Sequence, residues 1–455
     1  MSLTNPTEET IAAIASAVSP GEGAIAIVKV SGPFAKKVVS TIVRIPGKQE
    51  WKSHSILYGY VINQKTKKKI DEVLILIMDG PRSFTGEDVV EIHCHGGLIA
   101  VQATLEQILI QPNTRRAFPG EFSQRAVLNG RLDITQAEAI HELISARTQK
   151  AAQLAMAGMD GDISNAIKKI KNQLIDQLSE IEARIDFEED LPALNSKTLF
   201  ADLMLIRDQL NQLISDAKQG CLIRNGLKVA LIGSPNVGKS SLLNFFSKKE
   251  KAIVTNIPGT TRDLLESDII LKGIPITLLD TAGIRETNDA IEKIGVSRSH
   301  KALLTADVVV LIFDVSQGWT TNDQKLLKQI PTDTPKLIVG NKSDLPSQDS
   351  GSIANATMSA LTGEGENEVI MKLLKICGAN TTSGVEIALN QRQLDLVKDA
   401  VNAIDQIAEV ATQHLPWDFW TIDLREAIYK LNEVTGEELT EVLLDRIFAR
   451  FCIGK

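Results

Sequence analysis

A glycine-rich stretch after a short apolar run constrains the fold of this chain more than any other feature. Residues 233–240 read Gly-Ser-Pro-Asn-Val-Gly-Lys-Ser and follow the apolar residues 229–232. The stretch fits the pattern G-x-x-x-x-G-K-[ST], in which a strand ends in a loop that opens a helix. Such a loop directs backbone N–H groups, a lysine and a helix N-terminus at one small volume, which suits a polyphosphate. The sequence therefore predicts an α/β domain that binds a nucleotide.

Four later segments predict which nucleotide is bound. Within residues 258–263, Thr261 can reach Mg2+ beside the γ-phosphate, and a strand over 276–280 ends in Asp280-Thr-Ala-Gly, which senses that phosphate. A strand over 336–339 leads to Asn-Lys-Ser-Asp344. The Asp344 carboxylate can accept hydrogen bonds from N1–H and the 2-amino group of guanine, whereas adenine would leave it unpaired. GTP is therefore favoured over ATP, and Ser359-Ala360 is expected to form the last base-contacting loop.

These motifs predict both the nucleotide contacts and the magnesium ligands. Ser240 and Thr261 are the expected Mg2+ ligands. The predicted GTP-binding residues are Asn236, Val237, Gly238, Lys239, Ser240, Ser241, Thr255, Asn256, Ile257, Pro258, Gly259, Thr260, Thr261, Asp280, Thr281, Ala282, Gly283, Asn341, Lys342, Ser343, Asp344, Ser359, Ala360 and Leu361.

Composition narrows the class of protein. The 455 residues carry a formal net charge of −8, which argues against a broad cationic surface for nucleic acid. No apolar run approaches the ~18 residues that cross a bilayer, and the N-terminus lacks a basic region, so a cytoplasmic protein is expected. The four cysteines contain no C-x-x-C pair, which favours neither a disulfide framework nor a zinc ribbon.

Periodicity divides the chain into three parts. The first 120 residues alternate short apolar runs at 24–30, 73–77 and 89–92 with one predicted helix at 100–109, which indicates an α+β domain. Apolar residues then recur at gaps of three and four over 163–185 and 199–213, with Gly220 as the expected stop of the second helix. The same helical period resumes over 394–410 and 424–431.

A helical pattern on both sides of an α/β segment predicts an insertion. Each helical half would expose an apolar face unless the two halves pack together. We therefore expect an N-terminal α+β domain at 1–122, a discontinuous helical domain at 123–221 and 379–455, and an inserted Ras-like GTPase domain at 222–378. Two chain connections would let the inserted domain move against the helical body.

The hydrolytic residues are harder to predict. Many small GTPases place a glutamine after D-x-x-G to orient water, but Ile284 stands there in this chain. The available acidic candidates are Glu286, Asp289 and Glu292. The γ-phosphate charge could be balanced by Arg262 or Arg285, or by a monovalent cation held by Asn236 and the 255–261 loop.

Several further stretches carry a resemblance to a known family. They are Phe84-Thr-Gly-Glu-Asp-Val-Val-Glu91, His95-Gly-Gly97, Pro119-Gly-Glu-Phe122, the 125–133 segment and the C-terminal Phe451-Cys-Ile-Gly-Lys455. Together with the GTPase motifs, they resemble the MnmE or TrmE family of tRNA modification GTPases from end to end. The resemblance implies an N-terminal domain similar to tetrahydrofolate-dependent aminomethyl transferases, and a GTPase domain inserted in a helical domain.

The resemblance also implies partners and cofactors. Members dimerise through their N-terminal domains and act with a flavin-dependent partner, MnmG or GidA, on C5 of the wobble uridine of certain tRNAs. A one-carbon tetrahydrofolate, 5-formyl- or methylene-, is the implied carbon source. By motif, folate contacts fall on Lys29, Glu91, Arg131 and Lys455, where a carboxylate can pair with the pterin and cations with the glutamate tail.

Further catalytic roles follow from the resemblance alone. It implies K+ held by Asn236, Thr255, Ile257 and Thr260, G domains that dimerise face to face, Glu292 as general base, and a modification-essential Cys452. A thiol beside Lys455 could be nucleophilic, and an inert buried position at a helix end is the alternative.

One departure from the family pattern and one competing function remain. The chain has Glu22 where many members carry arginine, which puts any anion contact there in doubt. A GTP-dependent RNA-binding or ribosome-assembly switch without one-carbon chemistry is the competing function.

Overall fold

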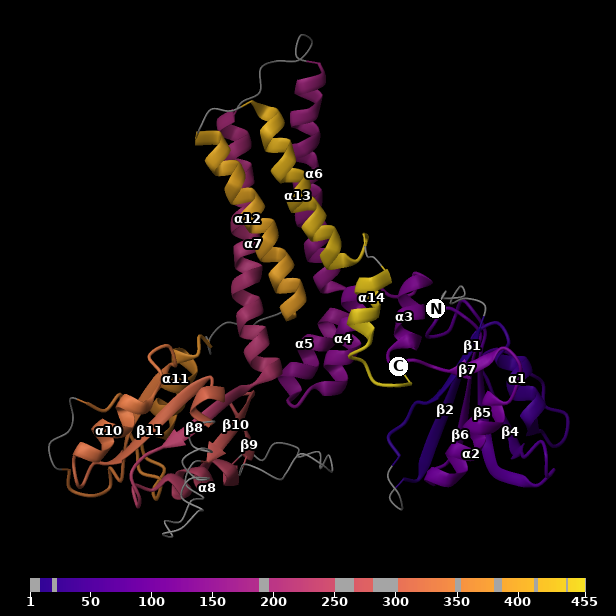
Figure 1. Ribbon diagram of the computed structural model, residues 1–455, viewed down its shortest axis with the longest axis horizontal. Helices are drawn as coiled ribbons and strands as arrows, with labels where there is room; N and C mark the ends of the chain where they lie inside the picture. The colour runs from indigo at the N-terminus through magenta and orange to yellow at the C-terminus, as the bar shows by residue number, and fades with distance from the viewer. Residues whose placement is uncertain are drawn as a thin grey trace. The chain divides into compact units, whose positions relative to one another are not determined.

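The computed structural model describes residues 9–18, 23–187, 196–249, 266–280, 302–347, 353–379, 387–412, 416–438 and 441–454 (Figure 1). The chain forms two compact units. The first contains Met1–His141 and Thr435–Lys455, and the second contains Glu142–Val434. The three-domain boundaries expected from the sequence stay a prediction. Among the described residues, no helix is long and apolar enough to span a membrane.

A seven-stranded sheet forms the body of the first unit. Its strand order is β3-β4-β5-β6-β2-β1-β7, with all pairs antiparallel except β1 and β7. The strands are β1 (Thr10–Ile14), β2 (Ile25–Ser31), β3 (Val43–Arg44), β4 (Ser55–Ile62), β5 (Lys69–Met78), β6 (Val89–His95) and β7 (Thr114–Arg116). The three strands predicted over 24–30, 73–77 and 89–92 are therefore confirmed as β2, β5 and β6.

Alternation along these strands decides which face is buried. Val28, Ile75 and Ile92 share one cluster with α1 (Ala35–Ile42) and α2 (Leu98–Leu109), which cover that face. On the opposite face, Ile56 of β4 and Leu74 of β5 are exposed, whereas Ile11 of β1 and Lys29 of β2 are buried.

The C-terminal segment completes the first unit. Helix α14 (Glu441–Phe448) packs against α3 (Glu121–Leu128) and against the part of α4 (Ile134–Ser145) that belongs to this unit, which ends at His141. Ile134, Leu444 and Phe448 form a small core between these helices. The backbone N–H of Gly120 donates to the Cys452 carbonyl at 3.3 Å. A Cβ on Gly120, whose φ is +70°, would lie 2.5 Å from the Phe448 carbonyl oxygen. Only glycine fits between this loop and the chain end.

Long helices form one part of the second unit. They are α5 (Gln149–Met159), α6 (Asp162–Asp186), α7 (Ser196–Asn225), α12 (Gln391–Thr412) and α13 (Trp417–Thr435). Ile167 of α6, Leu203 of α7, Ile404 of α12 and Leu424 of α13 belong to one apolar cluster. The expected packing of the two helical halves, from before and after the α/β segment, is therefore confirmed.

The predicted stop of the helix at Gly220 is wrong. Helix α7 continues to Asn225, and the chain turns at Gly226, whose φ is +73°. Gly220 has a packing role instead, because a Cβ built there would lie 2.2 Å from the Cβ of Ala388. The glycine lets the 388 segment approach the helix backbone closely, which no local pattern reveals.

A six-stranded sheet forms the α/β part of the second unit, in the order β13-β12-β11-β8-β10-β9. Only β9 is antiparallel to its neighbour. The elements are β8 (Leu227–Ile232), α8 (Lys239–Lys249), β9 (Glu266–Leu271), β10 (Ile274–Asp280), β11 (Val308–Asp314), α10 (Thr321–Gln329), β12 (Lys336–Asn341), β13 (Ala356–Thr357) and α11 (Glu366–Ile376).

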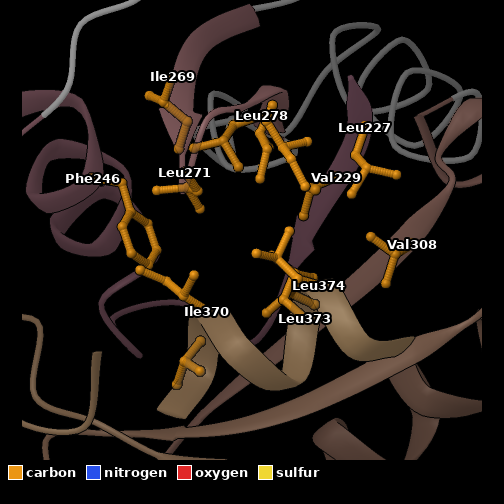
Figure 2. Close-up of a cluster of buried hydrophobic side chains, with 14 of the residues drawn as sticks. Leu227, Val229, Phe246, Ile269, Leu271, Leu278, Val308, Ile370, Leu373 and Leu374 are labelled. Atoms are coloured by element: carbon orange, nitrogen blue, oxygen red, sulfur yellow. The ribbon is translucent and has the colours of Figure 1, made fainter. Parts of the chain in front are cut away.

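The two faces of this sheet have separate cores. Along β8, Val229 and Leu231 join a cluster with Phe246 of α8 and Leu374 of α11 (Figure 2). Ala230 and Ile232 join a second cluster with Leu311 and Leu303. Because both faces are covered, the central strands carry continuous apolar runs, at 229–232 in β8 and 308–313 in β11, as in a parallel sheet between helices. Along the chain, an α+β domain is thus followed by a helical domain into which an α/β P-loop domain is inserted.

Candidate functional site

The predicted nucleotide motifs meet at one edge of the six-stranded sheet. Strands β8, β11 and β12 are parallel neighbours. Strand β8 is followed by the 233–238 loop, β11 ends at Asp314 and β12 ends at Asn341. In open α/β sheets the carboxyl ends of such strands form the ligand-binding edge. Parallel pairing therefore brings together segments that lie about 100 residues apart in the sequence.

The phosphate loop fits tightly into this edge. A Cβ on Gly233 would lie 2.2 Å from the Ile312 carbonyl oxygen, and one on Gly238 would lie 2.2 Å from Asn341 Nδ2. Asn236 adopts a φ of +65°, a left-handed conformation that asparagine tolerates, and its side chain is exposed. Lys239 Nζ donates to the carbonyl oxygens of Gly233 at 2.7 Å and Ser234 at 2.8 Å, so its ammonium lies over the loop.

Asn341 ties the phosphate loop to the base-contacting loop. Its side chain is 1% exposed; Nδ2 donates to the Val237 carbonyl at 2.8 Å, and Oδ1 accepts from the Ala360 N–H at 3.0 Å. Buried amides that satisfy both ends in this way fix the segments they join. The structure thus brings together predicted residues from three motifs.

Ser359 and Asp344 complete the base side of this edge. The buried Ser359 hydroxyl accepts from the N–H groups of Leu361 and Thr362, which closes the turn in which exposed Leu361 lies. The neighbouring Ser343 N–H donates to the Met358 carbonyl at 3.2 Å. Asp344 is exposed directly after Ser343, where its carboxylate is accessible to a base.

Asp314 is a site residue that sequence reasoning missed. Its carboxylate accepts from Lys342 Nζ at 2.6 Å and from the Ser316 hydroxyl at 2.7 Å. Burial raises the pKa of Asp314, but the hydrogen bonds from Lys342 and Ser316 outweigh burial and hold that pKa below its ordinary value. The anionic carboxylate therefore anchors Lys342, whose φ is +67°.

Several predicted residues lie outside the described part of the chain. They are Thr255, Asn256, Ile257, Pro258, Gly259, Thr260, Thr261, Thr281, Ala282, Gly283, Glu292 and Lys455. Of Asp280 the structure gives the backbone, as the last residue of β10. Ser240 and Ser241 are exposed in the first turn of α8.

In the first unit, two of the predicted folate residues lie side by side. Lys29 and Glu91 are direct partners across β2 and β6, with Nζ and Oε1 3.9 Å apart. The Lys29 ammonium lies 4.2 Å from the ring centroid of Phe84 and 5.2 Å from that of Phe122. His93, two residues along the same face, places Nε2 3.6 Å from Glu91 Oε2. Arg131 is exposed in the turn after α3.

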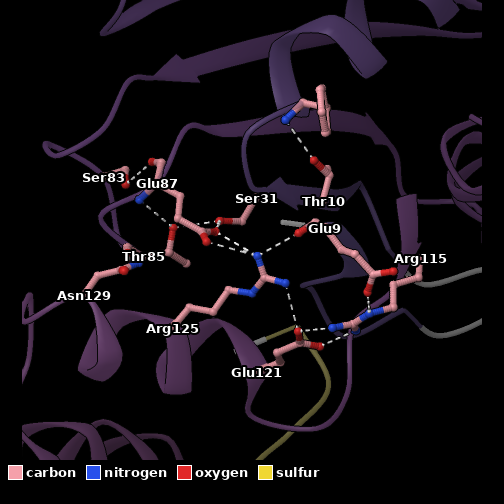
Figure 3. A network of polar contacts seen from close by, with 11 residues as sticks. Glu9, Thr10, Ser31, Ser83, Thr85, Glu87, Arg115, Glu121, Arg125 and Asn129 are labelled. Carbon is pink, nitrogen blue, oxygen red and sulfur yellow. Dashed lines mark hydrogen bonds and ion pairs between the residues drawn. The ribbon is translucent and has the colours of Figure 1, made fainter. Parts of the chain in front are cut away.

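A buried ionic network borders these residues (Figure 3). Arg125, which is 2% exposed, donates to both Glu87 carboxylate oxygens at 3.1 Å and to Glu121 Oε1 at 3.0 Å. Arg115 makes two further hydrogen bonds to Glu121, at 2.6 and 2.7 Å, and one to Glu9 at 2.7 Å. The i, i+4 spacing of Glu121 and Arg125 was a signal for part of this network, but their more distant partners were not predictable.

The network fixes the loop that carries Phe84. Ser31 Oγ lies 2.7 Å from Thr85 Oγ1 and donates to Glu87 at 2.7 Å, while Asn129 donates to the Thr85 carbonyl at 2.7 Å. Because the Phe84 ring lies beside the Lys29 ammonium, the network also holds that ring in place.

Cys452 is exposed, so it does not occupy the buried helix-end position that the inert alternative assumed. The backbone here is fixed by the hydrogen bond from Gly120, and a Cβ on Gly454 would lie 2.6 Å from the Ile14 carbonyl oxygen. The segment that carries the thiol therefore packs against the end of β1.

Comparison with known proteins covers nearly the whole chain. The family description "GTP-binding protein TrmE N-terminus" matches residues 10–131, and "MnmE helical domain" matches residues 134–452. A "tRNA modification GTPase MnmE" of Prochlorococcus marinus (strain SARG) is 73% identical over 455 residues, and that of strain MIT 9303 is 60% identical over 464 residues. In both cases the similarity covers 100% of each chain.

Proposed function

The chain belongs to the MnmE family of tRNA modification GTPases, and on that premise we propose that it is a K+-activated GTPase that modifies the wobble uridine of certain tRNAs. With a flavin-dependent partner of the MnmG type, it would add an aminomethyl or carboxymethylaminomethyl group to C5. The carbon would come from a tetrahydrofolate one-carbon unit. GTP hydrolysis would be coupled to dimerisation of the G domains within a homodimer.

One observation supports the nucleotide part of this proposal above the others. The Asn341 side chain joins the phosphate loop at Val237 to the base loop at Ala360. A ligand with a phosphate end and a base end is the chemical class that needs both loops in fixed register. Lys239 would then pair with the β- and γ-phosphates, and Asp344 would accept from guanine.

The cations would add positive charge where the γ-phosphate separates. We propose that Ser240 and Thr261 hold Mg2+, and that Asn236, Thr255, Ile257 and Thr260 hold K+. Asn236 fits this role because its amide is exposed on the phosphate loop. Glu292 would accept the proton of the attacking water.

The first unit would hold the folate. Lys29, Glu91, Arg131 and Lys455 are the proposed contacts, and the adjacent Lys29 and Glu91 side chains offer opposite charges for a glutamate tail and a pterin edge. Exposed Cys452 would act in the modification step.

Hydrolysis measurements test the GTPase part. GTP turnover by the full chain should be at least about tenfold faster in K+ than in Na+, since one well-placed charge contributes a few kcal/mol to transition-state stabilisation. Glu292→Ala should abolish most of the K+-dependent rate, while Asp289→Ala serves as the matched acidic control. Equal rates in the two salts, with no loss in Glu292→Ala, would contradict the mechanism.

Reconstitution tests the modification part. The full chain, tRNA, a one-carbon folate, GTP and the flavoprotein should yield a modified wobble base detectable by mass spectrometry. GTP hydrolysis without any modified base would favour the competing RNA-binding switch.

A further inference from the structure

The start of the phosphate loop is hydrogen-bonded to a buried carboxylate on a helix that is distant in the sequence. Ser234 Oγ donates to Asp323 Oδ1 at 2.7 Å and accepts from Asn322 Nδ2 at 3.0 Å. Asp323 is 2% exposed and lies in the first turn of α10, 89 residues further along the chain. A charge-assisted hydrogen bond to a buried carboxylate is stronger than one between neutral groups. Ser234 occupies a variable position of the phosphate-loop motif, and neither Asn322 nor Asp323 belongs to the motifs that indicated a nucleotide.

The two oxygens of Asp323 serve different partners. Oδ2 accepts from the Thr320 N–H at 3.0 Å and from the Thr320 hydroxyl at 2.7 Å, which completes the capping box of α10. Oδ1 accepts from Ser234. One carboxylate therefore caps a helix and holds the phosphate loop, and the two tasks can be separated by mutation.

The attachment leads to the lysine of the site. The hydroxyl of Ser234 holds this residue against Asp323. The carbonyl oxygen of the same residue accepts from Lys239 Nζ at 2.8 Å. The carbonyl of the preceding Gly233 accepts from the same ammonium at 2.7 Å. Both carbonyls that orient Lys239 thus lie at the start of the phosphate loop, which is the part attached to Asp323.

We propose that Ser234 and Asp323 are positioning residues for nucleotide binding, which hold the phosphate loop so that Lys239 faces the phosphates. This inference rests on the proposed GTPase function. A loop held in its binding conformation loses less entropy when a ligand is bound. Without the attachment, the loop and its lysine would have to be ordered by the nucleotide itself, and affinity would fall.

Two single substitutions separate positioning from helix capping. Ser234→Ala removes the attachment and leaves the capping box intact, so the Kd of the full chain for a fluorescent GDP analogue should rise about tenfold. Thr320→Ala removes the cap and leaves the attachment, so thermal stability should fall while that Kd stays within about twofold of wild type. Ser234→Thr keeps the hydroxyl and should restore affinity.

The outcomes distinguish this inference from the proposed function. Wild-type affinity in Ser234→Ala would overturn the inference, and so would an equal loss of affinity in Thr320→Ala, because the effect would then come from the helix. Failure of the wild-type chain to bind the GDP analogue would instead refute the proposed function.

Discussion

At the scale of single residues, the ion pair between half-buried Arg115 and buried Glu121 makes stability depend on pH. Burial raises the pKa of Glu121, but hydrogen bonds from Arg115 and from the Phe118 N–H outweigh it, so the folded pKa lies below its ordinary value. The pair therefore stabilises the fold fully above about pH 4.3, the unfolded value, and less as pH falls through the lower folded pKa.

Arg115→Gln should reduce this acid sensitivity, because Glu121 would lose its main cation. We expect the free energy of unfolding around α3, followed by hydrogen exchange in urea, to fall less between pH 7 and about pH 3 in the variant than in wild type. Arg425→Gln is the matched control, since its pair with Glu182 is exposed and should contribute little. Equal pH dependence in Arg115→Gln and wild type would contradict the assignment.

The same scale shows what a single sequence can reveal about a site. Asn341 and Lys239 were predictable because their motifs are local in sequence. Asp323 and Arg125 were not, because their partners Ser234 and Glu87 lie 89 and 38 residues away and no spacing rule joins them. Buried polar groups are satisfied by tertiary neighbours, and these depend on the fold.

At the scale of elements, the presence of Gly220 within the C-terminal part of α7 is explained by its contact with Ala388. Alanine stabilises a helix interior by up to about 1 kcal/mol relative to glycine, but a Cβ here would lie 2.2 Å from that of Ala388. We expect Gly220→Ala to destabilise the chain by roughly 1–3 kcal/mol in thermal or urea unfolding, because the clash exceeds the gain in helix propensity.

The matched control is a double variant. Gly220→Ala combined with Ala388→Gly moves the methyl group from one side of the contact to the other, so most of the lost stability should return. Additive losses in the double variant would show that the two positions are not in contact. Helical periodicity predicted α6, α7, α12 and α13 correctly, yet it misread Gly220, because a stop and a close approach both call for glycine.

At the scale of the whole molecule, the order of elements was more predictable than their partners. The helices predicted before and after the α/β segment each carry an apolar face, which implied that the two helical halves pack together. Leu203 and Ile404, one from each half, do share one core. The return of the chain end to the first unit carried no such signal. It depends on Gly120, Phe448 and Gly454 fitting closely, which is a matter of shape rather than of hydrophobic pattern.

That fit gives the last prediction. Gly120→Ala places a methyl group against the Phe448 carbonyl at a φ of +70°, which should cost about 1–3 kcal/mol and loosen the segment that carries Cys452. Hydrogen exchange should rise in peptides of α14 and of residues 449–454. GDP binding should be unchanged, because the described core residues beneath the nucleotide motifs, from Ala146 to Ala388, all belong to the second unit. Unchanged exchange in α14 would contradict the close fit, and weakened GDP binding would show that the two units do not act independently.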